Sequence, residues 1–156
     1  MLKIQIPGGR VHRFKYLVAD YNGTLALDGQ PLLGVAEALR ALATDLDIHV
    51  LTADTFGQAR AELAELPCQV TILGPDAQDQ AKEVYLQALG PAQCVAIDNG
   101  RNDRLMLAAA MLGITIVQGE GAAVQTLLAA DVVAPDIQTA LGLVLEPKRL
   151  VATLRH

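Results

Sequence analysis

Apolar and polar residues alternate at the start of the chain. Leucine and isoleucine occupy every second position from Leu2 to Ile6, and Pro7-Gly8-Gly9 then favours a turn. A second extended run leads into the apolar segment Tyr16-Leu-Val-Ala-Asp20. This pattern predicts an N-terminal β-hairpin that continues into a core strand.

After Asp20, short apolar runs alternate with segments whose apolar residues recur at the helical period. Helices of this length between strands imply right-handed crossovers and a largely parallel sheet. The sequence therefore predicts an α/β fold, a three-layer Rossmann-like sandwich with a mainly parallel central sheet. The predicted strands are 48–52, 69–73, 94–98, 114–117 and 132–133; the predicted helices are 35–45, 55–66, 77–89, 101–112 and 122–130, with helical turns beyond.

Composition supports one compact unit. With 156 residues, 52% of them hydrophobic, the chain fits a single hydrophobic core, so we expect one domain over 1–156. Aromatic residues make up only 3% and tryptophan is absent, so leucine, valine, isoleucine and alanine must fill the core. This mixture suits parallel strands covered by helices.

Charge and apolar length exclude several classes of protein. A net charge of -5 without a run of Lys or Arg argues against nucleic-acid binding. The longest apolar stretch, Leu105 to Val117, is too short to span a bilayer, and no apolar leader is evident, so we expect a cytoplasmic protein. Cys68 and Cys94 both open strand-like runs, which favours reduced thiols.

The candidate site residues lie where the predicted strands end. Asp20 closes the first core strand and is followed at once by Tyr-Asn22-Gly23-Thr24, a turn whose backbone amides can support a phosphoryl group. Aspartate, asparagine and glycine also dominate ordinary turns. Since ligands of open α/β sheets bind at the carboxyl ends of the strands, Asp20 remains the leading candidate.

Three later features fall at comparable places. Thr52 ends the second core strand, Lys82 lies in the first half of a helix, and Asp98-Asn-Gly-Arg-Asn-Asp103 follows the fourth strand. Each has a simpler explanation: a helix N-cap at Thr52 or Asp54, a solvated helix charge, and a turn at Asn99-Gly100. Their joint occurrence in this order favours a functional site.

In this order the motifs resemble those of the haloacid dehalogenase (HAD) superfamily, over nearly the full chain. Within it, the chain is similar to soluble proteins that resemble the phosphorylation domain of P-type ATPases, and Ala129-Ala-Asp-Val-Val133 is also similar to the P-type pattern. The first motif matches Asp20-Tyr-Asn22-Gly23-Thr24, the second matches Thr52, the family lysine matches Lys82, and the fourth motif resembles Asp98 to Asp103.

The resemblance implies nucleophilic catalysis in which Asp20 forms an aspartyl-phosphate. It also implies a Mg²⁺ ion. Thr52, Lys82 and the amides of Gly23 and Thr24 would stabilise the transferring oxygens. The implied metal ligands are the Asp20 carboxylate, the Asn22 backbone carbonyl, and Asp98, Asn99 and Asp103 of the fourth motif.

Two departures from the family pattern weaken the expected activity. Family phosphatases carry an acid/base aspartate where this chain has Asn22, so turnover should be slow. In the fourth motif, alignment on Asn102-Asp103 places the family's first aspartate on Asn99, whereas a looser spacing selects Asp98. Both alignments remain open.

These observations favour a slow HAD-type phosphatase or phosphoryl-transfer protein. It would act on a small phosphorylated molecule or a phosphoprotein, and whether it uses ATP is open. The short spacing between motifs leaves no room for a cap domain, and we expect a homo-oligomer, most simply a dimer. The alternative is a catalytically weakened HAD-fold binding or regulatory module. A two-component receiver domain would need an acidic pair before Asp20, which is missing.

Overall fold

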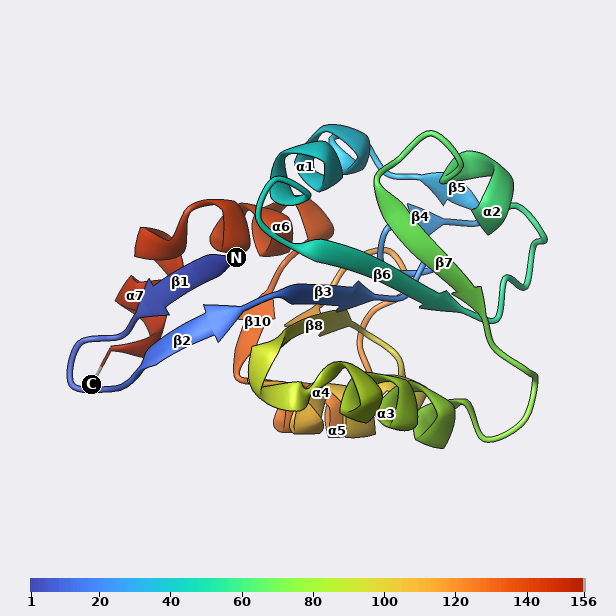
Figure 1. Cartoon of the computed structure of the whole chain (residues 1–156). Coiled ribbons are helices and arrows are strands. Elements are labelled where there is room, and N and C mark those ends of the chain that lie inside the picture. Colours follow the sequence, from blue (N-terminus) through green and yellow to red (C-terminus); the bar gives the residue numbers. More distant parts are fainter. Residues whose placement is uncertain (156) are drawn as a thin grey trace.

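A six-stranded parallel sheet forms the centre of the molecule in the computed structural model, which describes residues 1–155 (Figure 1). Every neighbouring pair of its strands runs parallel. This arrangement confirms the predicted α/β fold with a mainly parallel sheet. The strand order is β10-β9-β8-β3-β6-β7, with β3 at Tyr16–Ala19, β6 at Asp47–Thr52, β7 at Cys68–Ile72, β8 at Cys94–Asp98, β9 at Leu112–Ile116 and β10 at Val132–Ala134.

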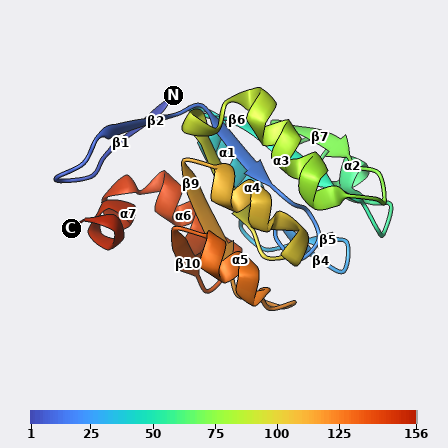
Figure 2. The same cartoon turned by 90° about the horizontal axis from the view of Figure 1, so that it is seen from below.

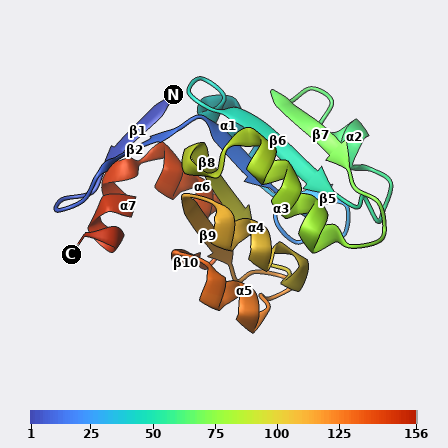
Figure 3. The same ribbon diagram turned by 60° about the horizontal axis from the view of Figure 1, so that its bottom comes forward.

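Helices cover both faces of this sheet (Figures 1 and 3). Leu17 of β3 packs into the core on the side of α1 and α6, whereas its neighbour Val18 packs into the core on the side of α3 and α4. The alternation of side chains along one strand therefore builds two apolar layers. The helices are α1 (Val35–Leu42), α2 (Ala59–Glu62), α3 (Gln78–Leu89), α4 (Arg104–Ala109), α5 (Val124–Ala129), α6 (Ile137–Leu145) and α7 (Pro147–Leu154), with short 3-10 turns η1 (Pro91–Gln93) and η2 (Arg101–Asp103).

The predicted N-terminal hairpin is also confirmed. Strand β1 (Leu2–Gln5) pairs antiparallel with β2 (Val11–Phe14), and the chain then enters β3. The hairpin extends from the sheet and packs β1 beside α7 (Figure 2). Phe14 and Leu150 are both buried in the larger core, so the C-terminal helix holds the hairpin against the domain.

The predicted helix 55–66 is much shorter in the structure. Only Ala59–Glu62 forms α2, because Asp54 and Gly57 adopt positive φ angles of 50° and 68° that interrupt a helical path. The Asp54 carboxylate accepts hydrogen bonds from the amides of Gln58 and Ala59, both at 2.9 Å. The segment is a loop with one capped helical turn.

The predicted helix 101–112 is also wrong at both ends. Residues 101–103 form η2, α4 stops at Ala109, and Gly113 lies inside β9 rather than ending the helix. A side chain on Gly113 would bring its Cβ within 2.6 Å of the Leu107 carbonyl oxygen. The glycine is required because helix and strand approach closely there.

The order of the strands creates a switch point between β3 and β8. From β3 the chain moves outward to β6 and β7, and it then returns to the other side of β3 to form β8, β9 and β10. In open α/β sheets, ligands bind at the carboxyl edge beside such a switch point. Asp20 and Asp98 stand at the ends of these two strands.

Both cysteines are free thiols, as predicted. Burial raises the pKa of Cys68, and it raises the pKa of Cys94 to about 11, which disfavours a reactive thiolate at either position. Among residues 1–155, no helix has the length and apolar character needed to cross a membrane.

Candidate active site

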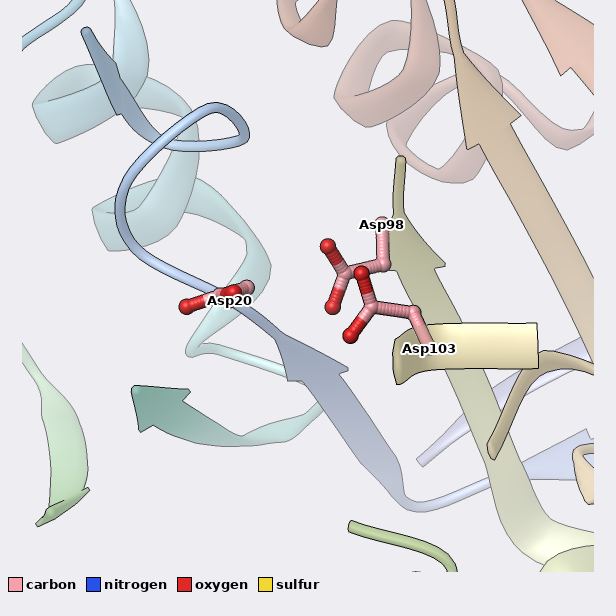
Figure 4. A group of neighbouring side chains, drawn as sticks. All are labelled: Asp20, Asp98 and Asp103. Carbon is pink, nitrogen blue, oxygen red and sulfur yellow. The ribbon is translucent and has the colours of Figure 1, made fainter. Parts of the chain in front are cut away.

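Asp20 immediately follows β3 and lies beside the end of β8 (Figure 4). Its side chain is 17% exposed, and its Oδ1 accepts a hydrogen bond from the Tyr21 amide at 2.6 Å. The buried Tyr21 hydroxyl donates to the Gly29 carbonyl at 3.0 Å. This contact fastens the first turn after β3 to the small hairpin β4 (Ala26–Leu27) and β5 (Gln30–Pro31), which the sequence did not predict. Asp20 is therefore held firmly and still reaches solvent.

Lys82 projects from α3 into a cluster of three carboxylates. Its Nζ lies 3.0 Å from Asp20 Oδ2 and 3.2 Å from Asp98 Oδ2, and it also forms an ion pair with Asp103. Lys82 has no exposed surface. The side chain that could have been a solvated helix charge is thus a buried counterion, and it joins strand ends that are far apart in the sequence.

The three acidic side chains exceed the charge that one lysine can balance. Figure 4 shows Asp98 and Asp103 close together and facing the end of β3 at Asp20, and carboxylate oxygens of all three lie within 4.8 Å of each other. Burial, reinforced by Asp98, raises the pKa of Asp20 to about 6. Burial also raises the pKa of Asp98, with Asp103 adding to the effect. Oxygen donors with two surplus negative charges fit a divalent cation such as Mg²⁺.

The same cluster of carboxylates keeps Lys82 protonated. Burial alone would lower the pKa of Lys82, but the neighbouring Asp98, Asp20 and Asp103 more than offset this effect and raise the pKa above its ordinary value. Lys82 therefore stays a cation at neutral pH and can oppose negative charge on a group that approaches Asp20.

Thr52 ends β6, next to β3 in the sheet, and is almost completely buried. Its Oγ1 accepts a hydrogen bond from the Asp54 amide at 3.0 Å. The hydroxyl hydrogen is not used by this bond and can still donate to a ligand. Asp54, and not Thr52, caps α2, so the two roles that the sequence left open are divided between the two residues.

Gly23 and Thr24 shape the loop after Asp20. Their amides donate within the loop, Gly23 to the Ala26 carbonyl at 2.7 Å and Thr24 to the Tyr21 carbonyl at 3.2 Å. Both amides were expected to face a phosphoryl group, and this structure instead uses them to hold the turn. The Thr24 hydroxyl, which is buried, donates to Asp98 Oδ1 at 3.0 Å and links the loop to β8.

The fourth motif places both of its acids in the buried cluster. Asp98 is fully buried in the carboxylate cluster with Asp103, whose Oδ2 also accepts a hydrogen bond from the Gly100 amide at 2.7 Å. Asn99 lies next to this cluster, and its Nδ2 donates to the Gly121 carbonyl at 2.9 Å. Geometry thus brings Asp98 and Asp103 into the cluster, with Asn99 at its border.

Comparisons with known proteins identify the fold. No family model matches the chain. An uncharacterised protein of Methanocaldococcus jannaschii is 49% identical over 61 residues; the match covers 39% of this chain and 66% of that protein, slightly less than two thirds of its length. Several solved structures resemble nearly the whole chain.

The first is 3-deoxy-D-manno-octulosonate 8-phosphate phosphatase from Moraxella catarrhalis, with magnesium, phosphate and the sugar bound. Its TM-score is 0.68 and its identity 19%, with 92% of this chain and 95% of that chain covered. The second is the cobalt-bound deoxy-D-mannose-octulosonate 8-phosphate phosphatase of Haemophilus influenzae, with a TM-score of 0.71, 15% identity, and 93% and 95% covered.

A putative HAD superfamily hydrolase from Legionella pneumophila has a TM-score of 0.69 and 15% identity, over 91% of this chain and 87% of that chain. The chain has the HAD fold. At these identities the likeness concerns the fold alone. The fold accounts for the position of Asp20, because it places the end of β3 at the switch point of the sheet.

Within this HAD fold, Asn22 is turned toward the β4–β5 hairpin. Its Oδ1 accepts a hydrogen bond from the Gly29 amide at 3.0 Å. Its Nδ2 is buried and has no hydrogen-bond partner among residues 1–155. An amide nitrogen can donate a hydrogen bond, but it can neither release nor take up a proton near neutral pH.

Two residues near the site were not found from the sequence. Gln118 binds the loop after Asp20, and Glu120 lies against Gly23. Both belong to Gln118-Gly119-Glu120-Gly121, directly beyond β9 at the same edge of the sheet. A polar residue between two glycines after a core strand was the available signal, but the sequence alone does not show which loop it meets.

Proposed function

We propose that this protein catalyses Mg²⁺-dependent phosphoryl transfer through an aspartyl-phosphate on Asp20, with hydrolysis of a phosphate ester as the overall reaction. The observation that carries the proposal is a partly exposed Asp20, at the switch point of the sheet, paired with a buried and positively charged Lys82. The magnesium and phosphate bound by the Moraxella phosphatase, which has the same fold, support this reaction class.

The chain offers a suitable set of metal donors. Asp20, the Asn22 backbone carbonyl, Asp98 and Asp103 would hold the ion, with Asn99 beside them. When bound, Mg²⁺ would offset the negative charge of the phosphoryl group. The Lys82 ammonium now contacts all three carboxylates, so it would give up part of these contacts to the ion.

The protein's own groups supply the remaining chemistry. An oxygen of Asp20 attacks phosphorus, the bond from phosphorus to the leaving oxygen breaks, and an acyl phosphate remains on Asp20 until water hydrolyses it. Lys82, which contacts Asp20, and the Thr52 hydroxyl would bind phosphoryl oxygens. These donors favour a transition state with negative charge spread over those oxygens.

Proton transfer is the weak step. Asn22 cannot protonate a leaving group, and general acid–base help contributes about 10²- to 10⁴-fold in other enzymes. We therefore propose slow turnover of esters with poor leaving groups. A capless P-type-like subgroup, acting on a small phosphorylated molecule or a phosphoprotein, is the finer assignment that the motifs favour.

Replacing Asp20 with asparagine tests the proposal. Asp20→Asn should abolish Mg²⁺-dependent phosphate release from p-nitrophenyl phosphate and covalent phosphorylation detected by mass spectrometry after acid quench. Asp47→Asn is the matched control, because it makes the same change at an exposed position on the opposite end of the neighbouring strand β6. Unchanged activity in Asp20→Asn, or no phosphate release from any ester by the unmodified protein, would refute the proposal.

A further inference from the structure

The loop 118–121 is fastened to the loop that follows Asp20. Gln118 Nε2 donates to the carbonyl oxygens of Gly23 at 3.0 Å and Thr24 at 2.9 Å. Gln118 Oε1 accepts a hydrogen bond from the Ile137 amide at 2.8 Å. One carboxamide therefore uses both of its ends, and it holds two loops that are nearly a hundred residues apart in the sequence in a fixed relation.

The same loop is fastened to the fourth motif on its other side. Asn99 Nδ2 donates to the Gly121 carbonyl at 2.9 Å, and the Ala123 amide donates to the Asn99 carbonyl at 3.0 Å. Within the loop, the Gly121 amide donates to the Gln118 carbonyl at 2.7 Å. Glu120 is consequently carried on a tight turn whose two ends are bound to the loops that follow β3 and β8.

This turn brings the Glu120 carboxylate against Gly23. A Cβ placed on Gly23 would lie 2.2 Å from Glu120 Oε2 and 3.2 Å from Asn99 Oδ1, so the two oxygens border the same small space. Thr24 Oγ1 lies 3.4 Å from Asn99 Oδ1 and 3.0 Å from Asp98 Oδ1. Asn99 and Thr24 thus lie between Gly23 and the cluster of Asp20, Asp98 and Asp103, a cluster to which Glu120 itself does not belong.

The charges around the carboxylate cluster bear on the role of Glu120. Lys82 already neutralises part of the cluster, and the side chain bordering the cluster on the Gly23 side is the neutral Asn99. Glu120 forms no ion pair with any other residue of 1–155. An unpaired carboxylate on a fixed loop, next to a neutral amide at the border of a metal site, supplies charge that the fourth motif lacks.

We propose that Glu120 is an additional carboxylate of the divalent-cation site, acting on the side that faces Gly23 and Asn99. The inference rests on the proposed function only in assuming a cation at Asp20. It assigns a metal-binding role to a residue outside the four motifs. Glycine suits position 23 because the backbone there has a φ of 83°, a conformation that residues with side chains rarely adopt.

Mn²⁺ binding, measured by titration calorimetry without any phosphoester, tests the inference. Mn²⁺ serves as the probe because it accepts the same oxygen donors as Mg²⁺. Glu120→Gln should weaken Mn²⁺ binding about 10- to 100-fold, the range found when groups supporting a metal site are removed. Glu65→Gln makes the same change at an exposed position outside the site. It should alter the Mn²⁺ affinity less than about twofold, which is small beside a loss of about 10- to 100-fold.

A second titration in 1 M KCl distinguishes a Glu120 carboxylate close to the ion from one that attracts the ion only over a distance. At that salt concentration charges are screened beyond about 3 Å, so the effect of Glu120→Gln should persist if the carboxylate faces the ion. Equal affinity of Glu120→Gln and the unmodified protein, or a difference that vanishes in 1 M KCl, would overturn the inference. Since Glu120 is exposed, the variant should keep its thermal midpoint without metal.

The proposed function can fail separately. If Asp20→Asn abolishes Mn²⁺ binding while Glu120→Gln does not weaken it, only the role of Glu120 is refuted. If Glu120→Gln weakens Mn²⁺ binding but no ester is hydrolysed, the cation site stands and the phosphatase assignment fails. If the unmodified protein binds no Mn²⁺, both are refuted.

Discussion

Replacing Lys82 with methionine would remove the only cation in contact with the buried carboxylates among residues 1–155. The side chains of Asp98 and Asp103 are 0% and 1% exposed, so water cannot replace the lost ion pairs. Removing one partner of a buried ion pair costs about 3–5 kcal/mol in other proteins. We expect Lys82→Met to lose free energy of unfolding in this range at pH 8, measured by urea denaturation.

The loss should depend on pH. In the folded protein the pKa of Asp20, about 6, is raised above its ordinary value, so the folded state binds this proton more tightly than the unfolded state does. Stability attributable to Asp20 therefore increases as the pH falls through 6. Lys82 lowers the pKa of Asp20 and of Asp98, so without it both should be protonated more readily, and protonation removes the repulsion. The deficit of Lys82→Met should shrink between pH 8 and pH 5.

Magnesium should partly restore the stability of Lys82→Met. The ion would no longer compete with an ammonium group for the three carboxylates, and a ligand present at 100 times its Kd adds about 2.7 kcal/mol to folded-state stability. Circular dichroism is the suitable signal because the chain has no tryptophan. Lys148→Met, at an exposed position on α7, is the matched control. Equal stability of Lys82→Met and the unmodified protein at pH 8 would refute the charge argument.

Three other predictions follow from the loop after Asp20. Asn22→Asp should raise hydrolysis of alkyl phosphates more than that of aryl phosphates, because alkoxide leaving groups need a proton; equal gains would show that proton transfer is not limiting. Gln118→Ala should cost about 1–3 kcal/mol in urea denaturation, since it removes three hydrogen bonds; no loss would contradict its fastening role. Asn22-Gly23 should deamidate far more slowly in the folded protein than in a peptide, by mass spectrometry, because the Gly23 amide is bound to Ala26.

Local pattern was enough for the fold class and for the position of Asp20 at the carboxyl edge of the sheet. The strand 94–98 and the helix 77–89 agree with β8 and α3 almost residue for residue, because burial of one face or of a whole strand leaves a periodic trace in the sequence. Asp20, Thr52 and Asp98 end strands whose apolar runs are plain. Parallel connections then bring these ends to one edge without further information.

Tertiary structure decided what the local pattern does not encode. Gly113 resembles a helix stop in the sequence. Glycine is required there because the carbonyl of Leu107 packs against it. Lys82 resembles a surface charge, and only the packing of α3 against the sheet reveals it as a counterion for three acids. Glu120 carries only the weak signal of a polar residue between two glycines. Its place beside Gly23 depends on hydrogen bonds between loops that only the folded chain brings together, and contacts of that range leave no periodicity to read.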